Sequence, residues 1–222
     1  MAIISDLLEA ISFDDGYRAD GKTVVEGLEY YRTVVPEDKE AVAVIEPDLK
    51  KGPWIAGGAP LRWYQGLAVG ESDIDVFCRD EIQAQETIDR IKSYGRFVVK
   101  HESDNALTLG YRKIEEWNER WIIQIIKRRY FKSLQDVIDN FDITVCQIGT
   151  TGNEWVMNPH TARDIRERNI RFSQPLHPDA AKRLTKYWTY GYRPVEGTLE
   201  AIQRNPESVW KFTETGDYEN AF

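Results

Sequence analysis

The fold of this chain is decided by the stretch IAGGAPLRWYQGLAVGESDIDVF, which runs from Ile55 to Phe77. It begins as a short apolar strand, continues through the pair Gly57-Gly58 and a polar loop, and ends as a second strand that carries Asp73 and Asp75. Side chains two residues apart in a strand point to the same face, so the two carboxylates project together. Two carboxylates held in this way suit a hard divalent cation such as Mg²⁺.

The glycine pair predicts a phosphate contact. Glycine is favoured where the backbone turns sharply or approaches a ligand closely. The bare amides of Gly57 and Gly58 can hydrogen-bond a phosphate. Arg62 can either clamp a triphosphate or serve as a loop surface charge, and Ser72 is a weaker candidate for the same contact. Together with the paired aspartates, these parts indicate metal-assisted phosphate chemistry.

The order of these parts resembles the signature of the DNA polymerase beta-like nucleotidyltransferase superfamily. In that superfamily a Gly-Gly or Gly-Ser turn precedes an Asp-x-Asp strand, and a later strand adds a third carboxylate. Asp142, in FDITVCQIG, is the candidate for the third carboxylate. The segment GGAPLR is also similar to the Gly-Gly-x-x-Arg variant of the tRNA nucleotidyltransferase-like branch, with one extra residue before Arg62. The resemblance extends over residues 54–149.

This resemblance implies the transfer of a nucleoside monophosphate from an NTP such as ATP to an acceptor hydroxyl, with release of pyrophosphate. It implies that Asp73, Asp75 and Asp142 hold Mg²⁺ or Mn²⁺, with Asp142 completing the site of the ion that activates the hydroxyl. The nucleotide-binding residues that it implies are Gly57, Gly58, Arg62 and Ser72. The acceptor stays open: an RNA 3′ end, a protein hydroxyl, a small molecule or a second nucleotide.

Each of these residues also has a structural interpretation. Asp73 and Asp75 can be surface aspartates on an edge strand, although strands disfavour Asp and the pairing favours a functional site. Asp142 can be a cap between a helix and a strand. A catalytically silent nucleotide-binding module and an RNA-binding or interaction protein are the non-enzymatic alternatives.

Composition limits the class of protein. The net charge of −8 argues against a general nucleic-acid coat. Lys and Arg outnumber Asp and Glu over residues 120–204, which either forms an RNA-binding face or is an ordinary solvated surface. No apolar run approaches a membrane span, and the N-terminus lacks the features of a signal peptide. With only Cys78 and Cys146, both expected to be buried thiols, we expect a cytoplasmic protein.

The alternation of patterns predicts an α+β fold in which helices flank a mixed, nucleotidyltransferase-like β-sheet. We expect a catalytic core over residues 1–158, with a helical lead-in over 1–50, and a helical C-terminal region with an acidic tail over 159–222. The predicted strands are 53–56, the Asp-x-Asp strand, 96–100, 106–113, 121–126, 142–148, 154–157 and 169–172. The predicted helices are 22–35, 36–49, 79–93, one capped by Ser133, one carrying Arg163 to Arg168, 179–190 and 198–204.

Overall fold

The computed structural model describes residues 23–24, 34–70, 72–112, 119–173 and 179–204. Its elements in chain order are β1 (Thr23–Val24), η1 (Pro36–Asp38), α2 (Lys39–Ile45), β2 (Trp54–Ala56), α3 (Gly58–Tyr64), β3 (Asp73–Phe77), α4 (Glu81–Ser93), β4 (Phe97–Glu102), β5 (Ala106–Arg112), β6 (Glu119–Ile126), α5 (Leu134–Asp139), η2 (Thr144–Cys146), β7 (Ile148–Thr150), β8 (Trp155–Met157), α6 (Pro159–Glu167), β9 (Asn169–Ile170), α7 (Ala180–Thr189), β10 (Arg193–Pro194) and α8 (Thr198–Arg204).

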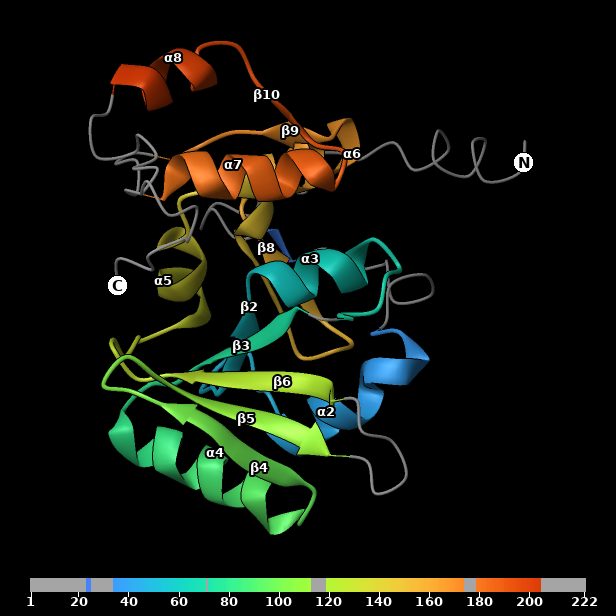
Figure 1. Cartoon of the computed structure of the whole chain (residues 1–222), viewed down its shortest axis with the longest axis vertical. Helices are drawn as coiled ribbons and strands as arrows, with labels where there is room; N and C mark the ends of the chain where they lie inside the picture. Colours follow the sequence, from blue (N-terminus) through green and yellow to red (C-terminus); the bar gives the residue numbers. More distant parts are fainter. Residues whose placement is uncertain (1–22, 25–33, 71, 113–118, 174–178, 205–222) are drawn as a thin grey trace, which may run out of the picture.

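A mixed sheet of order β1-β8-β7-β2-β3-β6-β5-β4 forms the centre of the molecule (Figure 1). β3 is an inner strand, antiparallel to β2 and parallel to β6. In this register Ile55 lies opposite Val76, and Asp75 lies opposite Gln124. β6 pairs along the whole of β3, whereas β2 pairs only with its end at Val76 and Phe77. β3 is therefore not an edge strand of the sheet, although Asp73 and Asp75 themselves pair only with β6.

The two faces of β3 differ in the way that its alternating sequence predicts. Ile74 and Val76 are fully buried, whereas Asp73 is exposed and Asp75 is partly buried. α4 packs its apolar side with this core, and its N-terminus is capped by Asp80, which accepts a hydrogen bond from the Gln83 amide at 2.8 Å. The burial of the apolar face holds the strand in register, so both carboxylates stay on the opposite face.

Asp38 lies behind the α3–β3 connection and is 3% exposed. Its carboxylate accepts hydrogen bonds from the indole N–H groups of Trp63 and Trp121, both at 2.8 Å, and from the Val69 amide at 2.7 Å. A buried carboxylate is stable only when its oxygens are well hydrogen-bonded, and this one has three donors. Asp38 therefore joins α3, β6 and the connection over residues 65–72.

The C-terminal elements form a layer over one end of the sheet. In Figure 1, α6, β9, α7, β10 and α8 lie above α3 and α5, and β9 pairs with β10 in a small parallel sheet. Tyr187 and Tyr192 are buried between this layer and the sheet. Gln65 of the lower part donates a hydrogen bond to the Tyr192 hydroxyl, and Tyr187 contacts Cys146, so the layer is joined to the sheet by polar contacts as well as by packing.

Most predicted elements are confirmed, and three expectations are wrong. The first concerns Thr23–Val24, which pair with β8 as a strand where a helix over 22–35 was expected; residues 25–33 lie outside the described chain. The second is the polar loop after the glycine pair, which is helix α3. Pro60 suits the first turn of a helix, and Leu61, Trp63 and Tyr64 are buried, so tertiary packing stabilises this short helix.

The third expectation that is wrong is the strand over 142–148. Only an isolated bridge joins Ile143 to Phe172, and Thr144–Cys146 form a tight 3-10 turn before β7 begins. The Thr161 hydroxyl bonds to the carbonyls of Thr144 and Gln147. The apolar alternation of this segment is real, but the carbonyls of Thr144 and Gln147 bond to Thr161 of α6 and not to a neighbouring strand. Cys78 and Cys146 are buried free thiols, as expected.

Within the described ranges no helix is long and apolar enough to span a membrane.

Candidate functional site

A cavity of about 370 Å³ opens between the sheet and the C-terminal layer. We call β3, α3 and the connection over 65–72 the floor, and α6, α7 and residues 190–194 the roof. Of the predicted site residues, those that line the cavity are Gly58, Arg62, Ser72, Asp73, Asp75 and Asp142. The structure therefore brings together six of the seven predicted site residues. Gly57 is the one of the seven that does not line the cavity.

Asp73 and Asp75 occupy the floor. Burial raises the pKa of Asp75 to about 7, and the neighbouring Asp73 carboxylate adds to that rise. Burial also raises the pKa of Asp73, whereas Lys186 of the roof opposes the rise at both residues. The shift of Asp75 expresses the cost of holding a desolvated carboxylate beside a second negative charge, and a divalent cation bound by the pair would offset that cost.

The glycine pair forms the turn that leads into α3. Gly57 has φ of 93°, and a Cβ at this position would lie 2.8 Å from Cζ of Phe141. Its amide donates to the Ile148 carbonyl at 2.9 Å. Gly57 is therefore required by conformation and packing, and its assignment as a nucleotide-binding residue stays a prediction. Gly58 begins α3 and faces the cavity.

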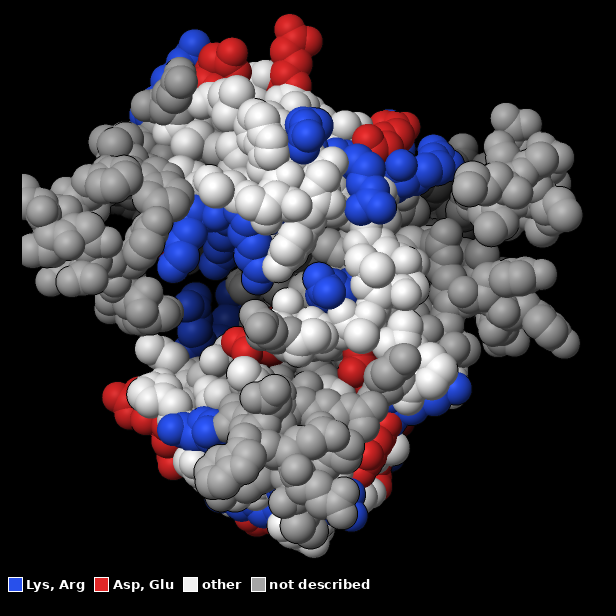
Figure 2. Space-filling view, turned by 45° about the vertical axis from the view of Figure 1, so that its right-hand side comes forward, with Lys and Arg blue, Asp and Glu red and all other residues white. Residues whose placement is uncertain are grey.

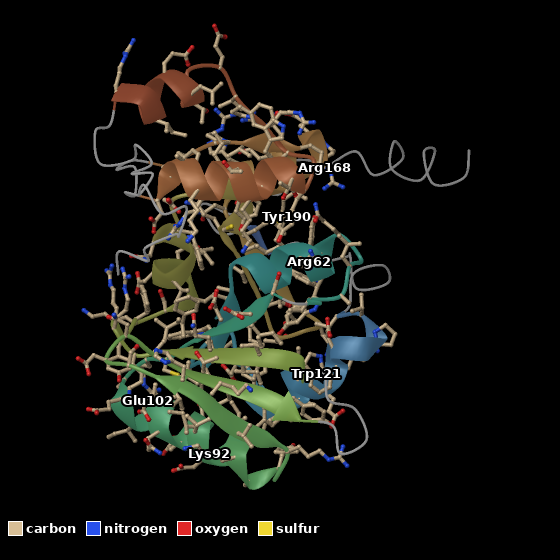
Figure 3. All side chains as sticks on the ribbon, in the orientation of Figure 1. Arg62, Lys92, Glu102, Trp121, Arg168 and Tyr190 are labelled. Carbon is tan, nitrogen blue, oxygen red and sulfur yellow. The ribbon has the colours of Figure 1, made fainter. Side chains whose placement is uncertain are left out.

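Arg62 lines the cavity and also stabilises the floor. Its Nε donates to the Ala68 carbonyl at 2.7 Å, and its guanidinium carbon lies 5.8 Å from the centre of the Tyr190 ring. Figure 3 shows Arg62 below Tyr190 and Arg168, in the space between α3 and α7. Arg62 therefore links the connection over 65–72 to the roof.

Asp142 enters the cavity from the loop before η2. Its Oδ1 forms an ion pair with Nη1 of Arg183 at 2.5 Å, and the buried Oδ2 has no hydrogen-bond partner. Among the described residues, no three Asp, Glu, His or Cys side chains come together as a metal-binding group. Asp73 and Asp75 lie at alternate positions of β3 and both line the cavity, and two carboxylates are the kind of ligand that a divalent cation takes. The role of Asp142 as a third ligand stays a prediction.

The roof supplies positive and aromatic side chains that are not among the seven predicted site residues: Arg168, Arg183, Lys186, Tyr187 and Tyr190. The residues from α7 and its C-terminal cap recur every three or four positions, which places them on one side of the helix. That spacing was visible in the sequence and would have grouped them. Arg168 has φ of 57° at the end of α6, a conformation that few non-glycine residues adopt, and its guanidinium lies 5.3 Å from the centre of the Tyr192 ring.

The charges of the cavity are segregated. Figure 2 shows Lys and Arg gathered along the upper wall of a hollow, with Asp and Glu on the surface below it. The described lining residues include the acids Asp73, Asp75 and Asp142 and the bases Arg62, Arg168, Arg183 and Lys186. A cation bound to the floor would leave the whole cavity strongly positive. Such a cavity is suited to a polyanion of small size, such as a triphosphate.

Comparison with solved structures identifies the fold. The CCA-adding enzyme of Thermotoga maritima in complex with tRNA is similar with a TM-score of 0.55 and 17% identity, over 82% of this chain and 45% of that one. A CCA-adding enzyme in complex with CTP gives 0.58 and 17%, over 82% and 46%. The Bacillus stearothermophilus enzyme with CTP gives 0.53 and 16%, over 77% and 44%.

At these identities the likeness shows the fold, which is that of the CCA-adding nucleotidyltransferases, and this chain spans less than half of each of those structures. This is the nucleotidyltransferase-like fold that the sequence predicts. No curated protein matches the chain. The family model of the Gabija anti-defense 2 family protein matches residues 29–168, which include all of the floor and all of α6. This chain belongs to the Gabija anti-defense 2 family.

Proposed function

We propose that this protein is a metal-dependent nucleotidyltransferase that transfers a nucleoside monophosphate from an NTP to an acceptor hydroxyl. The observation that carries the proposal is the cavity itself, in which a pair of repelling carboxylates faces a cationic roof. The likeness to enzymes solved with CTP and ATP supports an NTP as the substrate.

The floor and the roof have different tasks in this proposal. Asp73 and Asp75 would hold Mg²⁺ or Mn²⁺, which would neutralise charge on the phosphate oxygens and lower the pKa of the acceptor hydroxyl. Arg62, Arg183 and Lys186 would bind the remaining phosphate charge, and Gly58 and Ser72 would contact the nucleotide from the floor.

The reaction balances without a further reagent. The acceptor oxygen forms a bond to the α-phosphorus, while the bond between that phosphorus and the α–β bridging oxygen breaks. Pyrophosphate leaves with the bonding electrons, and the hydroxyl proton is released to a base or to water. The protein contributes position and charge, which are the main requirements of phosphoryl-transfer chemistry.

RNA is the acceptor that we place first. A CCA-adding enzyme was solved with tRNA, and in this chain Arg163 and Arg166 are exposed on α6 while Lys186 lines the cavity. Contacts to phosphates make binding steeply salt-dependent. RNA binding that persists at high salt, or that is unchanged when these three residues become Ala, would leave a protein hydroxyl or a small molecule as the acceptor.

The test uses each NTP labelled separately at the α- and at the γ-phosphate, with Mg²⁺ and pools of RNA, protein and small-molecule acceptors. We expect the α-label to be transferred and the γ-label to be released in pyrophosphate. The matched control is the double variant Asp73→Asn/Asp75→Asn, which should transfer neither label. Transfer of the γ-label, or equal transfer by the double variant, would contradict the proposal.

A catalytically silent role is the second candidate, and it is consistent with a family that is named for action against Gabija defence. In that case the protein would bind NTPs through the same cavity and transfer no label to any pool. Nucleotide binding without transfer, together with loss of anti-defense action in the roof variants, would favour this second role.

A further inference from the structure

We infer that Asp142 acts through Arg183: its carboxylate orients the guanidinium toward the Asp73–Asp75 pair, so that Arg183 binds the anionic part of the nucleotide. Asp142 is then a positioning residue for nucleotide capture and not a third metal ligand. This inference rests on the proposed function, because it concerns the nucleotide that the same cavity would bind.

The backbone of Asp142 is held by the roof side of the molecule. Its carbonyl accepts a hydrogen bond from the Ser173 amide at 2.7 Å, and the next residue, Ile143, bridges to Phe172. The preceding carbonyl, that of Phe141, accepts from the Ser173 hydroxyl at 3.0 Å and from the Gln147 side chain at 2.9 Å. The strand neighbours of β3 are β2 and β6, so Asp142 does not lie on a strand beside the Asp73–Asp75 pair.

The side chain of Asp142 is committed to one partner. It is 10% exposed and Arg183 is 38% exposed, so the ion pair is shielded on one side and open to the cavity on the other. An arginine held at one corner of its planar fork keeps its other N–H groups in a fixed direction, which favours recognition of phosphate. Fixing the side chain before the ligand arrives also lowers the entropy cost of binding.

Arg183 lines the same cavity as the two floor carboxylates. The guanidinium that Asp142 holds therefore faces the space in which an anion bound at Asp73 and Asp75 would lie.

The test separates a metal ligand from a positioning residue by measuring nucleotide binding with and without metal. ATP and CTP are titrated by calorimetry into the full chain, its Asp142→Asn variant, its Arg183→Gln variant and the double variant, once in EDTA and once with Ca²⁺. We expect Asp142→Asn to weaken binding about tenfold in both conditions, because a charge-assisted contact is lost in either case. The double variant should bind no more weakly than Arg183→Gln alone.

Arg168→Gln is the matched control, since Arg168 lines the same cavity and is held by Tyr192 and not by Asp142. Its effect should add to that of Asp142→Asn. Arg183→Lys keeps the charge without the fork and should show part of the loss. Circular dichroism melts of every variant verify folding. If Asp142→Asn does not fold, the comparison of Arg183→Gln with Arg183→Lys decides whether binding needs a directed guanidinium.

Three outcomes would overturn the inference. The first is an effect of Asp142→Asn that appears only with Ca²⁺, which would assign Asp142 to the metal. The others are additive effects of Asp142→Asn and Arg183→Gln, and nucleotide binding by Arg183→Lys that equals that of the wild type. Wild-type protein that binds neither nucleotide in either condition would instead refute the proposed function. Wild-type protein that binds nucleotide but transfers no label would refute catalysis and leave the role of Asp142 intact.

Discussion

The floor and the roof of the cavity are built in opposite ways. The floor brings its two carboxylates from alternate positions of one inner strand, and Asp38 supports it from behind with three buried hydrogen bonds. The roof collects its cations from α6 and α7, and Arg168 and Lys186 are exposed. The floor is therefore supported from behind and electrostatically costly, whereas the roof presents partly exposed cations to the cavity. The difference indicates that chemistry belongs to the floor and capture to the roof.

The largest effect should come from the floor. We expect Asp75→Asn to lower nucleotidyl transfer at least about 1000-fold, equivalent to roughly 4 kcal/mol in the barrier, because the remaining carboxylate cannot hold the cation alone. Lys186→Gln, a roof variant, should mainly raise the KM for the NTP. Steady-state kinetics with the labelled NTP measure both. A larger loss in kcat from Lys186→Gln than from Asp75→Asn would reverse the assignment of tasks.

The next effect concerns two buried aspartates, one behind the floor and one in the roof. Asp38→Ala should lower the free energy of unfolding by about 3–5 kcal/mol, because it leaves three buried donors without an acceptor. Asp164 of α6 is equally buried, but its Oδ1 has no partner, and its Oδ2 accepts from Thr144 and from the partly exposed Arg171. Asp164→Ala should cost about 1–2 kcal/mol. Urea unfolding of both variants tests the order, and equal losses would contradict it.

The third prediction concerns pH. In EDTA, the folded protein keeps a proton on Asp75 up to about pH 7, whereas the unfolded chain loses it near 3.8. The folded state therefore binds more protons between these values, and stability should fall as pH rises from about 4 to about 7. Discounted for the solvent that reaches the partly buried side chain, the loss is about 2–3 kcal/mol.

Asp75→Asn should flatten this pH dependence, and Mg²⁺ should reduce it, since the ion favours the charged carboxylate. Thermal melts across this pH range supply the measurement. A wild-type stability that rises over the same range would show that Asp75 is charged in the metal-free floor.

The smallest effect compares two glycines with positive φ. Gly57→Ala in the floor should cost about 2–3 kcal/mol, because the conformation is strained for alanine and the new methyl group meets Phe141. Gly191→Ala in the roof has a similar φ of 88° and no atom within 4 Å of the added Cβ. Its cost should be about 1 kcal/mol, from strain alone. Chemical unfolding of the two variants measures the difference, which should disappear if Phe141 moves aside freely.

Much of the floor could be predicted from the sequence because its signals are local. The alternation in DIDVF places Asp73 and Asp75 on one face, and Ile74 and Val76 on the other, whatever surrounds the strand. Local signals failed for the segment over 142–148, which was predicted to be a strand. Its alternation is equally clear, but the carbonyls of Thr144 and Gln147 accept hydrogen bonds from the hydroxyl of Thr161, which belongs to a different element.

The sequence by itself determined the paired carboxylates, the glycine turn and the α+β alternation, because each depends on spacings of a few residues along one segment. Only the tertiary structure decided that β3 is an inner strand, that the cations of α6 and α7 close over it, and that Asp142 pairs with Arg183. These contacts join residues far apart in the chain, and they form because burying the apolar sides of the sheet and of α7 brings their polar sides together. Local patterns describe which side of an element is polar, and the packing of the whole chain determines what that side meets.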